Sequence, residues 1–208
     1  MKKQNPFDIH TAAYEEWFQQ NSIQYQSELL ALQQAVPKNK KGVEIGVGTG
    51  IFAQPLGVSH GIDPSAPMLE IARTRDIEVT QALAEELPFE DSTFDYTLFI
   101  TSICFIDNPK AALQEAHRVT KEGGTIIVAI IDGASDLGKA LHKRKDKSKF
   151  YAPAYFFSAD DIVQLLQAQG YTVTESWQTL IENNPTKPEQ PIKGTGQGGF
   201  VVIKGEKQ

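Results

Sequence analysis

Short β-rich runs alternate with helical stretches from residue 42 onward, and this alternation restricts the chain to few folds. It is typical of β-α-β units that build a parallel sheet. Four of the five runs are almost continuously apolar, as expected for strands covered by helices on both faces. The runs are 42–47, 58–63, 77–82, 94–100 and 124–131.

Helical patterns fill the segments between and around these runs. Apolar side chains at helical spacing predict one helix or two before Pro37. A helix over 108–124 is expected to stop at Gly123 and Gly124. Ser158 begins another, with a capping box to Asp161.

The remaining segments are an insert and two late β-like runs. The insert covers 132–157, and the runs 171–180 and 199–205 are separated by a Pro- and Gly-rich loop that could return the chain antiparallel. A chain of 208 residues fits one domain.

Three alternating glycines follow the first run, in EIGVGTG (44–50). A dinucleotide-binding turn would need its third glycine at position 51, which is Ile51, and no Lys-Ser/Thr pair follows for a triphosphate loop. The carboxylate of Glu44 would repel a pyrophosphate but suits a ligand with positive charge, such as an ammonium or sulfonium group. This combination points to S-adenosylmethionine.

Composition narrows the class further. Lys and Arg number 20 and Asp and Glu 26, so the net charge of −6 argues against a nucleic-acid coat. No apolar run approaches the roughly 18 residues of a membrane span, and the first residues do not resemble a signal peptide. We therefore expect a cytoplasmic protein that binds neither nucleic acid nor membrane. Its single cysteine, Cys104, and four scattered histidines predict no metal site.

Four motifs occur in the order found in one enzyme family. They are EIGVGTG (44–50), GIDPS (61–65), AEELPFEDSTFD (84–95) and RVTKEGG (118–124). In these motifs the chain resembles the class I S-adenosylmethionine-dependent methyltransferases, in the small-molecule (methyltransferase type 11-like) subgroup, over about residues 42–173.

The resemblance implies a fold. It is an α/β, doubly wound, Rossmann-like and mostly parallel seven-stranded sheet with an antiparallel last strand, a set of N-terminal helices and a helical insert as lid. The expected parts are an N-terminal helical lid (1–38), a cofactor-binding core (39–131), the insert (132–157) and a C-terminal helix with strands (158–208).

The resemblance also implies how the methionine and ribose parts of the cofactor are held. Gly46, Gly48 and Gly50 would line the methionine part, with Glu44 near its ammonium group. Asp63, at the end of the second strand, would accept hydrogen bonds from both ribose hydroxyls. If it binds no ligand, Asp63 would instead cap the helix that follows.

Five further residues would contact the rest of the cofactor. Pro64 and Met68 would pack near the adenine, and Ala84 and Glu85 would present backbone groups to its edge. Thr101 would lie beside the methionine carboxylate and amine. Many relatives carry Asp where this chain has Leu83, which puts one adenine contact in doubt.

The acceptor side is expected under a lid of aromatic segments. A small-molecule acceptor would be methylated by in-line displacement, in which the protein supplies mainly positioning and exclusion of water. No catalytic base can be assigned from the sequence. The candidate substrate residues are Tyr14, Trp17, Phe18, Phe105 and Tyr155.

Other interpretations stay open at this point. A cofactor-binding sensor or partner subunit without turnover fits the same motifs. An NAD(P)-dependent reductase is disfavoured by Ile51 and by the absence of a Tyr-x-x-x-Lys pair. A nucleic-acid base methyltransferase is disfavoured because IDNPK (106–110) lacks the Asn/Asp-Pro-Pro-aromatic motif of that class. Cys104 is expected to be a small core residue, and the basic run 139–149 a solvated helix face.

Overall fold

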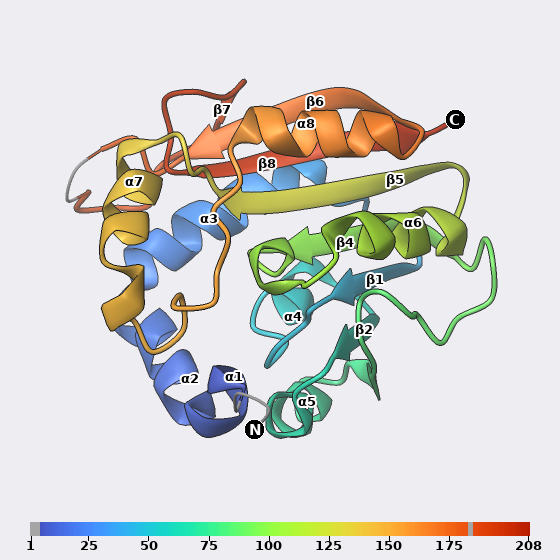
Figure 1. Ribbon diagram of the computed structural model, residues 1–208, viewed down its shortest axis with the longest axis horizontal. Helices are drawn as coiled ribbons and strands as arrows, with labels where there is room; N and C mark the ends of the chain where they lie inside the picture. The colour runs from blue at the N-terminus through green and yellow to red at the C-terminus, as the bar shows by residue number, and fades with distance from the viewer. Residues whose placement is uncertain (1–4, 183–184) are drawn as a thin grey trace.

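The computed structural model describes residues 5–182 and 185–208, and these form one mixed eight-stranded sheet with helices on both faces (Figure 1). The strand order is β3-β2-β1-β4-β5-β8-β6-β7. The first five are parallel, whereas β8 is antiparallel to both β5 and β6. The strands are β1 (Gly42–Ile45), β2 (His60–Asp63), β3 (Glu78–Gln81), β4 (Phe94–Ile100), β5 (Thr120–Ile131), β6 (Tyr171–Thr179), β7 (Ile192–Lys193) and β8 (Phe200–Lys207).

This architecture confirms the predicted Rossmann-like fold and its antiparallel last strand. The additional strand, β7, is only two residues long and pairs with β6 at one edge of the sheet. It lies inside the expected loop over 182–198, where a pair of residues is too short for a pattern of alternating side chains to be recognised.

Helices cover the two faces of the sheet and enclose two hydrophobic cores. α3, α4 and α5 pack on one face, and α6 and α8 on the other (Figure 1). In β4, Leu98 and Ile100 face the first core and Phe99 the second, as the alternation of a strand requires. The helices are α1 (Pro6–Ile9), α2 (Thr11–Gln20), α3 (Ser22–Ala35), α4 (Ala53–Leu56), α5 (Ala66–Arg73), α6 (Pro109–Val119), α7 (Asp136–Lys143) and α8 (Ala159–Ala168), with single 3₁₀ turns η1 (Ile103–Phe105) and η2 (Lys145–Lys147).

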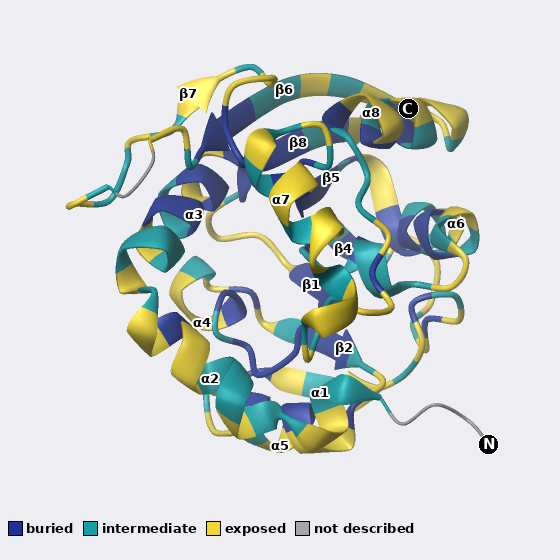
Figure 2. Cartoon of the chain, turned by 60° about the vertical axis from the view of Figure 1, so that its left-hand side comes forward, coloured by how far each residue is buried: buried dark blue, intermediate teal, exposed yellow. Residues whose placement is uncertain are grey.

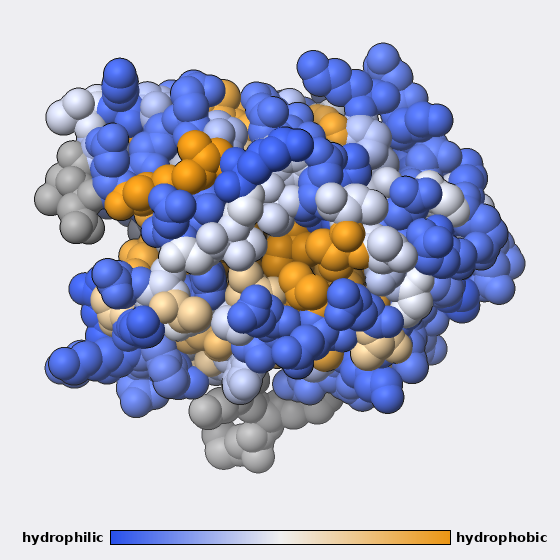
Figure 3. Space-filling view, turned by 90° about the horizontal axis from the view of Figure 1, so that it is seen from above, coloured by the Kyte–Doolittle hydropathy of each residue, from blue (hydrophilic) through white to orange (hydrophobic). Residues whose placement is uncertain are grey.

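The buried residues concentrate on the strands, while the outward sides of α2, α5 and α7 are exposed (Figure 2). Figure 3 shows the molecule from above, relative to the orientation of Figure 1. This face is mostly hydrophilic, with hydrophobic residues gathered in small patches. Within the described residues, no helix is long and apolar enough to cross a membrane.

One helix boundary differs from the prediction. α6 ends at Val119, and β5 already begins at Thr120, so Gly123 and Gly124 do not terminate a helix. Both glycines lie in β5, where its pairing with β4 shifts register between Phe94 and Tyr96. Gly123 has a φ of 67°, and a Cβ on Gly124 would lie 2.9 Å from the carbonyl oxygen of Asp95.

The terminal regions agree with the sequence in outline. The N-terminal segment forms three helices rather than one or two, and the capping box between Ser158 and Asp161 is present at the start of α8. Residues 1–4 of the expected lid and 183–184 of the expected loop lie outside the described residues.

Candidate functional site

The glycine turn after β1 is held in place by the neighbouring strand β2. The backbone N–H groups of Gly46 and Val47 donate to the carbonyl oxygen of Ile62 at 2.8 and 2.9 Å. At the end of β2, Asp63 accepts from the Gly48 N–H at 2.9 Å through Oδ2 and from the Ser65 N–H at 2.8 Å through Oδ1. Asp63 therefore joins the turn after β1 to the turn after β2, while Ser65 itself caps α5.

The three glycines of the turn have positive φ angles of 80°, 53° and 76°, but their surroundings differ. A Cβ on Gly46 would lie 2.4 Å from the Ser102 Cβ, and one on Gly50 would lie 2.3 Å from the Ile77 side chain. A Cβ on Gly48 would lie 3.6 Å from the Tyr14 hydroxyl, an ordinary contact distance. Close packing thus requires glycine at positions 46 and 50.

Glu44 lies on β1 directly before this turn and is 2% exposed. Its Oε2 is buried and has no hydrogen-bond partner among the described residues. Burial raises the pKa of this carboxyl well above its usual range, and the nearby charge of Asp63 adds to the effect. Because a buried carboxylate oxygen without a donor is costly, the neutral form of this carboxyl is favoured.

A cavity of about 690 Å³ opens beside these residues, at the carboxyl ends of the parallel strands. Ligands of doubly wound sheets bind at this edge. One part of its wall is formed by predicted cofactor residues: Gly46, Gly48, Asp63, Pro64, Met68, Ala84, Glu85 and Thr101. The two others, Glu44 and Gly50, lie behind this wall, Glu44 buried in β1 and Gly50 against α5.

Aromatic side chains form another part of the wall. Four of the five predicted substrate residues line the cavity: Tyr14, Trp17, Phe18 and Phe105. The fifth, Tyr155, is 63% exposed and packs against Phe157 instead, so the structure does not bring it to the cavity.

Rings from three segments meet over the cavity. Phe7 of α1 stacks on Phe150 of the insert at a centroid distance of 5.4 Å and contacts Phe105 of η1 edge-on at 5.0 Å. Both Phe7 and Phe150 line the cavity. Sequence reasoning did not identify them, although each lies in a segment that was expected to cover the acceptor.

Glu28 of α3 also lines the cavity and was not predicted from the sequence. A signal was present, because Glu28 shares one helix face with Ala31, Leu32 and Ala35, all of which are buried. An acid on a buried stripe is unusual and calls for a partner.

Helix α2, which belongs to the segment expected to form a lid, is linked to the core beside the glycine turn. Glu15 receives two hydrogen bonds from Arg75, at 2.6 and 3.1 Å, and Arg75 also donates to the carbonyl oxygen of Thr49. Burial alone would raise the pKa of Glu15, but the hydrogen bonds and the charge of Arg75 hold it below its usual value. This bidentate pair fixes α2 against the turn that α2 covers.

Two residues near the end of β4 have unusual environments. Thr101 has a φ of 48°, a strained conformation for a β-branched residue, and its N–H donates to the Ala129 carbonyl at 2.8 Å. The Cys104 thiol donates to the Thr101 carbonyl at 3.2 Å, and burial raises its pKa to about 12. Cys104 is half-buried and belongs to neither hydrophobic core, and it stays a neutral thiol at physiological pH.

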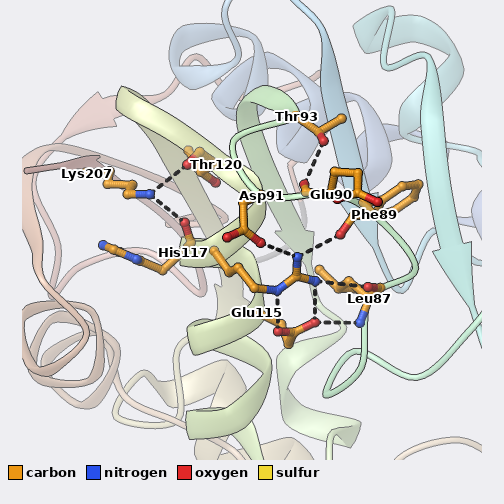
Figure 4. A network of polar contacts seen from close by, with 10 residues as sticks. Leu87, Phe89, Glu90, Asp91, Thr93, Glu115, His117, Thr120 and Lys207 are labelled. Carbon is orange, nitrogen blue, oxygen red and sulfur yellow. Dashed lines mark hydrogen bonds and ion pairs between the residues drawn. The ribbon is translucent and has the colours of Figure 1, made fainter.

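Arg118 joins two of the motifs that stood apart in the sequence, and its partners are labelled in Figure 4. Its guanidinium donates to the carbonyl oxygens of Leu87 and Phe89 at 3.0 and 2.7 Å, and to Asp91 at 2.8 Å. It also forms a two-pronged pair with Glu115, which in turn accepts from the Leu87 N–H at 2.8 Å. This network fixes the loop that follows Ala84 and Glu85.

Replacing Arg118 by lysine should destabilise the protein, because an ammonium group cannot serve two carbonyls and two carboxylates in the same plane. We expect a loss of about 2 kcal/mol in the free energy of unfolding, from the hydrogen bonds to a charged group that are lost. Urea unfolding measures this directly. Arg73→Lys, on the exposed end of α5, is the matched control; equal effects of the two substitutions would contradict a structural role for the network.

Within residues 5–182 and 185–208, no group of three or more His, Cys, Asp or Glu side chains could hold a metal ion. The described site consists of a glycine turn, an aromatic wall and the two buried acids Glu28 and Glu44.

A family model described as a methyltransferase domain matches residues 43–128. A crystal structure from Thermotoga maritima, described as a SAM-dependent methyltransferase and possible histamine N-methyltransferase, is 43% identical, with a TM-score of 0.95 over 98% of this chain and 99% of that one. An uncharacterised protein of Methanocaldococcus jannaschii is 44% identical over 98% of this chain and 99% of its own length.

A further relative matches part of the chain. A demethylmenaquinone methyltransferase of Renibacterium salmoninarum is 34% identical over 101 residues, 46% of this chain and 42% of its own length. Together with the sheet order and the glycine turn, these matches identify the chain as a methyltransferase of the class I, S-adenosylmethionine-dependent family.

Proposed function

We propose that this enzyme binds S-adenosylmethionine at the glycine turn and transfers its methyl group to a small molecule held against the aromatic wall. The observation that carries the proposal is the single cavity of about 690 Å³ that both sets of residues line. That volume falls in the range of pockets for small ligands.

The residues present are suited to this cofactor. Asp63 uses one acceptor site on each oxygen for backbone N–H groups, and a carboxylate has about four such sites, so two remain for ribose hydroxyls. Glu44 lies behind the cavity wall, so its unpartnered Oε2 would reach an ammonium group only through water. Pro64, Met68 and the Ala84–Glu85 segment would enclose the adenine.

The bound cofactor would supply an electrophilic methyl group on a sulfonium. The chain would position the reactants and exclude water. The glycine turn would hold the cofactor, and the rings of Phe7, Phe105 and Phe150 would keep water from the space beside its methyl group. Because Cys104 stays a neutral thiol, we propose direct transfer to the acceptor without a methylated protein intermediate.

Similar proteins support a small acceptor. The Thermotoga protein is described as a possible histamine N-methyltransferase, and the partial relative from Renibacterium as a demethylmenaquinone methyltransferase. The acceptors in both descriptions are small molecules rather than nucleic acids.

S-adenosylhomocysteine should stabilise the protein, whereas NAD and ATP should not. At 100 times its dissociation constant, a ligand adds about 2.7 kcal/mol, which for a chain of this size corresponds to a rise of about 5–10 °C in melting temperature. A thermal shift assay with the three ligands measures this. A shift with NAD, and none with S-adenosylhomocysteine, would overturn the proposed cofactor.

A further inference from the structure

We infer that Glu28 recognises the methyl acceptor, and that the acceptor is a small organic amine whose ammonium group is bound by the Glu28 carboxylate. This inference rests on the proposed function, because it places the acceptor in the same cavity as the cofactor.

The position of Glu28 is the first support. The residue is 4% exposed, yet it lines the cavity, so its small accessible surface faces the space available to a ligand. Gln24, one turn earlier on α3, donates to its Oε1 at 2.9 Å and holds the side chain in place. Gln24 lines the same cavity.

The charge of Glu28 has no counterpart in the described part of the chain. Gln24 is the one hydrogen-bond donor to this carboxyl among the described residues, and none of their ion pairs includes it. A buried carboxylate with a single neutral donor remains poorly compensated. A cationic ligand would supply the missing charge, whereas an anionic one would be repelled.

Two tyrosines feel the charge of Glu28, and three further acids, Asp63, Glu85 and Asp107, line the same cavity. Burial is the main cause that raises the pKa of Tyr25, on the same helix, and of Tyr151, from the insert, and the charge of Glu28 contributes to both. Both phenols are therefore neutral near pH 7 and supply no positive charge. Lys149 lines the cavity as well, but it is exposed to solvent.

Aromatic rings add a second feature that favours a cation. Tyr14, Trp17, Phe18 and Tyr151 line the cavity together with Glu28. Ring faces attract ammonium groups, and the attraction strengthens when water is excluded. A cavity lined by both a carboxylate and aromatic rings matches an organic ammonium group better than a neutral hydroxyl or a carbon acid.

The same carboxyl can take up the proton that amine methylation must remove. Burial raises the pKa of Glu28 to about 7, with the hydrogen bond from Gln24 opposing the rise. A group with this pKa can exist in either form near neutrality, which suits a general base.

Proton transfer would precede methyl transfer. The ammonium group gives one proton to the Glu28 carboxylate and becomes a neutral amine. The nitrogen lone pair then forms the new N–C bond while the C–S bond breaks and its electron pair stays on sulfur. The products would be the protonated N-methylated amine and S-adenosylhomocysteine, and Glu28 would return its proton to water after they leave.

The test compares a charged probe with a neutral one of the same shape. With protein saturated by S-adenosylhomocysteine, calorimetry should detect binding of phenethylamine but not of 2-phenylethanol. Glu28→Gln, which keeps size and hydrogen bonding, should weaken amine binding at least tenfold. Glu16→Gln, on the exposed side of α2, makes the same change outside the cavity and should have no effect.

A pH series separates recognition from a structural role. Because the folded-state pKa of Glu28 is raised to about 7, its charge is present above that pH and lost below it. The affinity of the wild-type protein for phenethylamine should therefore fall more than tenfold from pH 7.5 to pH 5.5. The much weaker binding by Glu28→Gln should not change over this range, and a parallel fall would contradict the inference.

The outcomes distinguish the inference from the proposed function. Failure of S-adenosylhomocysteine to bind would contradict the proposed function itself. Three results would overturn the role of Glu28 alone, provided that S-adenosylhomocysteine binds normally. They are equal affinity for the amine and the alcohol, no binding of the amine, and unchanged amine binding by Glu28→Gln.

Discussion

Asp63→Ala should weaken the binding of S-adenosylhomocysteine about 10- to 100-fold, the equivalent of roughly 1.5–3 kcal/mol for hydrogen bonds to a charged acceptor. The substitution removes the acceptors proposed for the ribose hydroxyls and also releases the Gly48 N–H that shapes the turn. The sheet should stay folded, because Asp63 bonds to turn residues rather than to core side chains. Calorimetry measures the affinity, and circular dichroism checks the fold.

Asp160→Ala is the matched control, since it removes a carboxylate from the exposed first turn of α8, away from the cavity. It should leave the affinity for S-adenosylhomocysteine unchanged. If a folded Asp63→Ala protein bound as tightly as the wild type, Asp63 would be reduced to an organiser of the two turns.

Gly46→Ala should have the largest combined effect on stability and binding. Its φ of 80° is strained for any residue with a Cβ, and that Cβ would lie 2.4 Å from Ser102, whose hydroxyl is bonded to the Ile45 carbonyl at 2.6 Å. We expect a loss of about 2–3 kcal/mol in unfolding free energy, or roughly 4–12 °C in melting temperature. Binding of S-adenosylhomocysteine should fall more than tenfold, because the turn must move.

Gly57→Ala separates the cost of a positive φ from the cost of the contact with Ser102. Gly57 has a similar φ of 70°, but a Cβ there would meet nothing within 4 Å, and the residue does not line the cavity. This variant should lose only the conformational part, about 1 kcal/mol, and keep full affinity. Equal losses in the two variants would show that contact with Ser102 is unimportant.

The sequence predicted those features that depend on local pattern. Apolar runs that alternate with helical stretches located the strands of the parallel sheet. The third glycine comes one position early, with Ile51 where a dinucleotide turn has glycine, and this distinguished the turn from a dinucleotide site. The capping box at Ser158 located the start of α8, because the two hydrogen bonds involve residues only three apart.

Features that depend on distant contacts could not be predicted in the same way. The early end of α6 follows from the pairing of Thr120 with Phe94, which is set by the sheet rather than by helix propensity. The contact between Phe7 and Phe150 joins segments more than 140 positions apart. The exposure of Tyr155 likewise depends on how the insert folds, since its N–H is bonded to the Cys104 carbonyl.

The most direct test of the account follows the methyl group itself. Protein incubated with methyl-labelled S-adenosylmethionine and a set of small amines should transfer label to an amine and form one S-adenosylhomocysteine for each methyl transferred. Asp63→Ala should slow this reaction at limiting cofactor, and Glu28→Gln should slow it at limiting amine. Tight cofactor binding with no label on any small molecule, together with label on nucleic acid or protein substrates, would contradict the account.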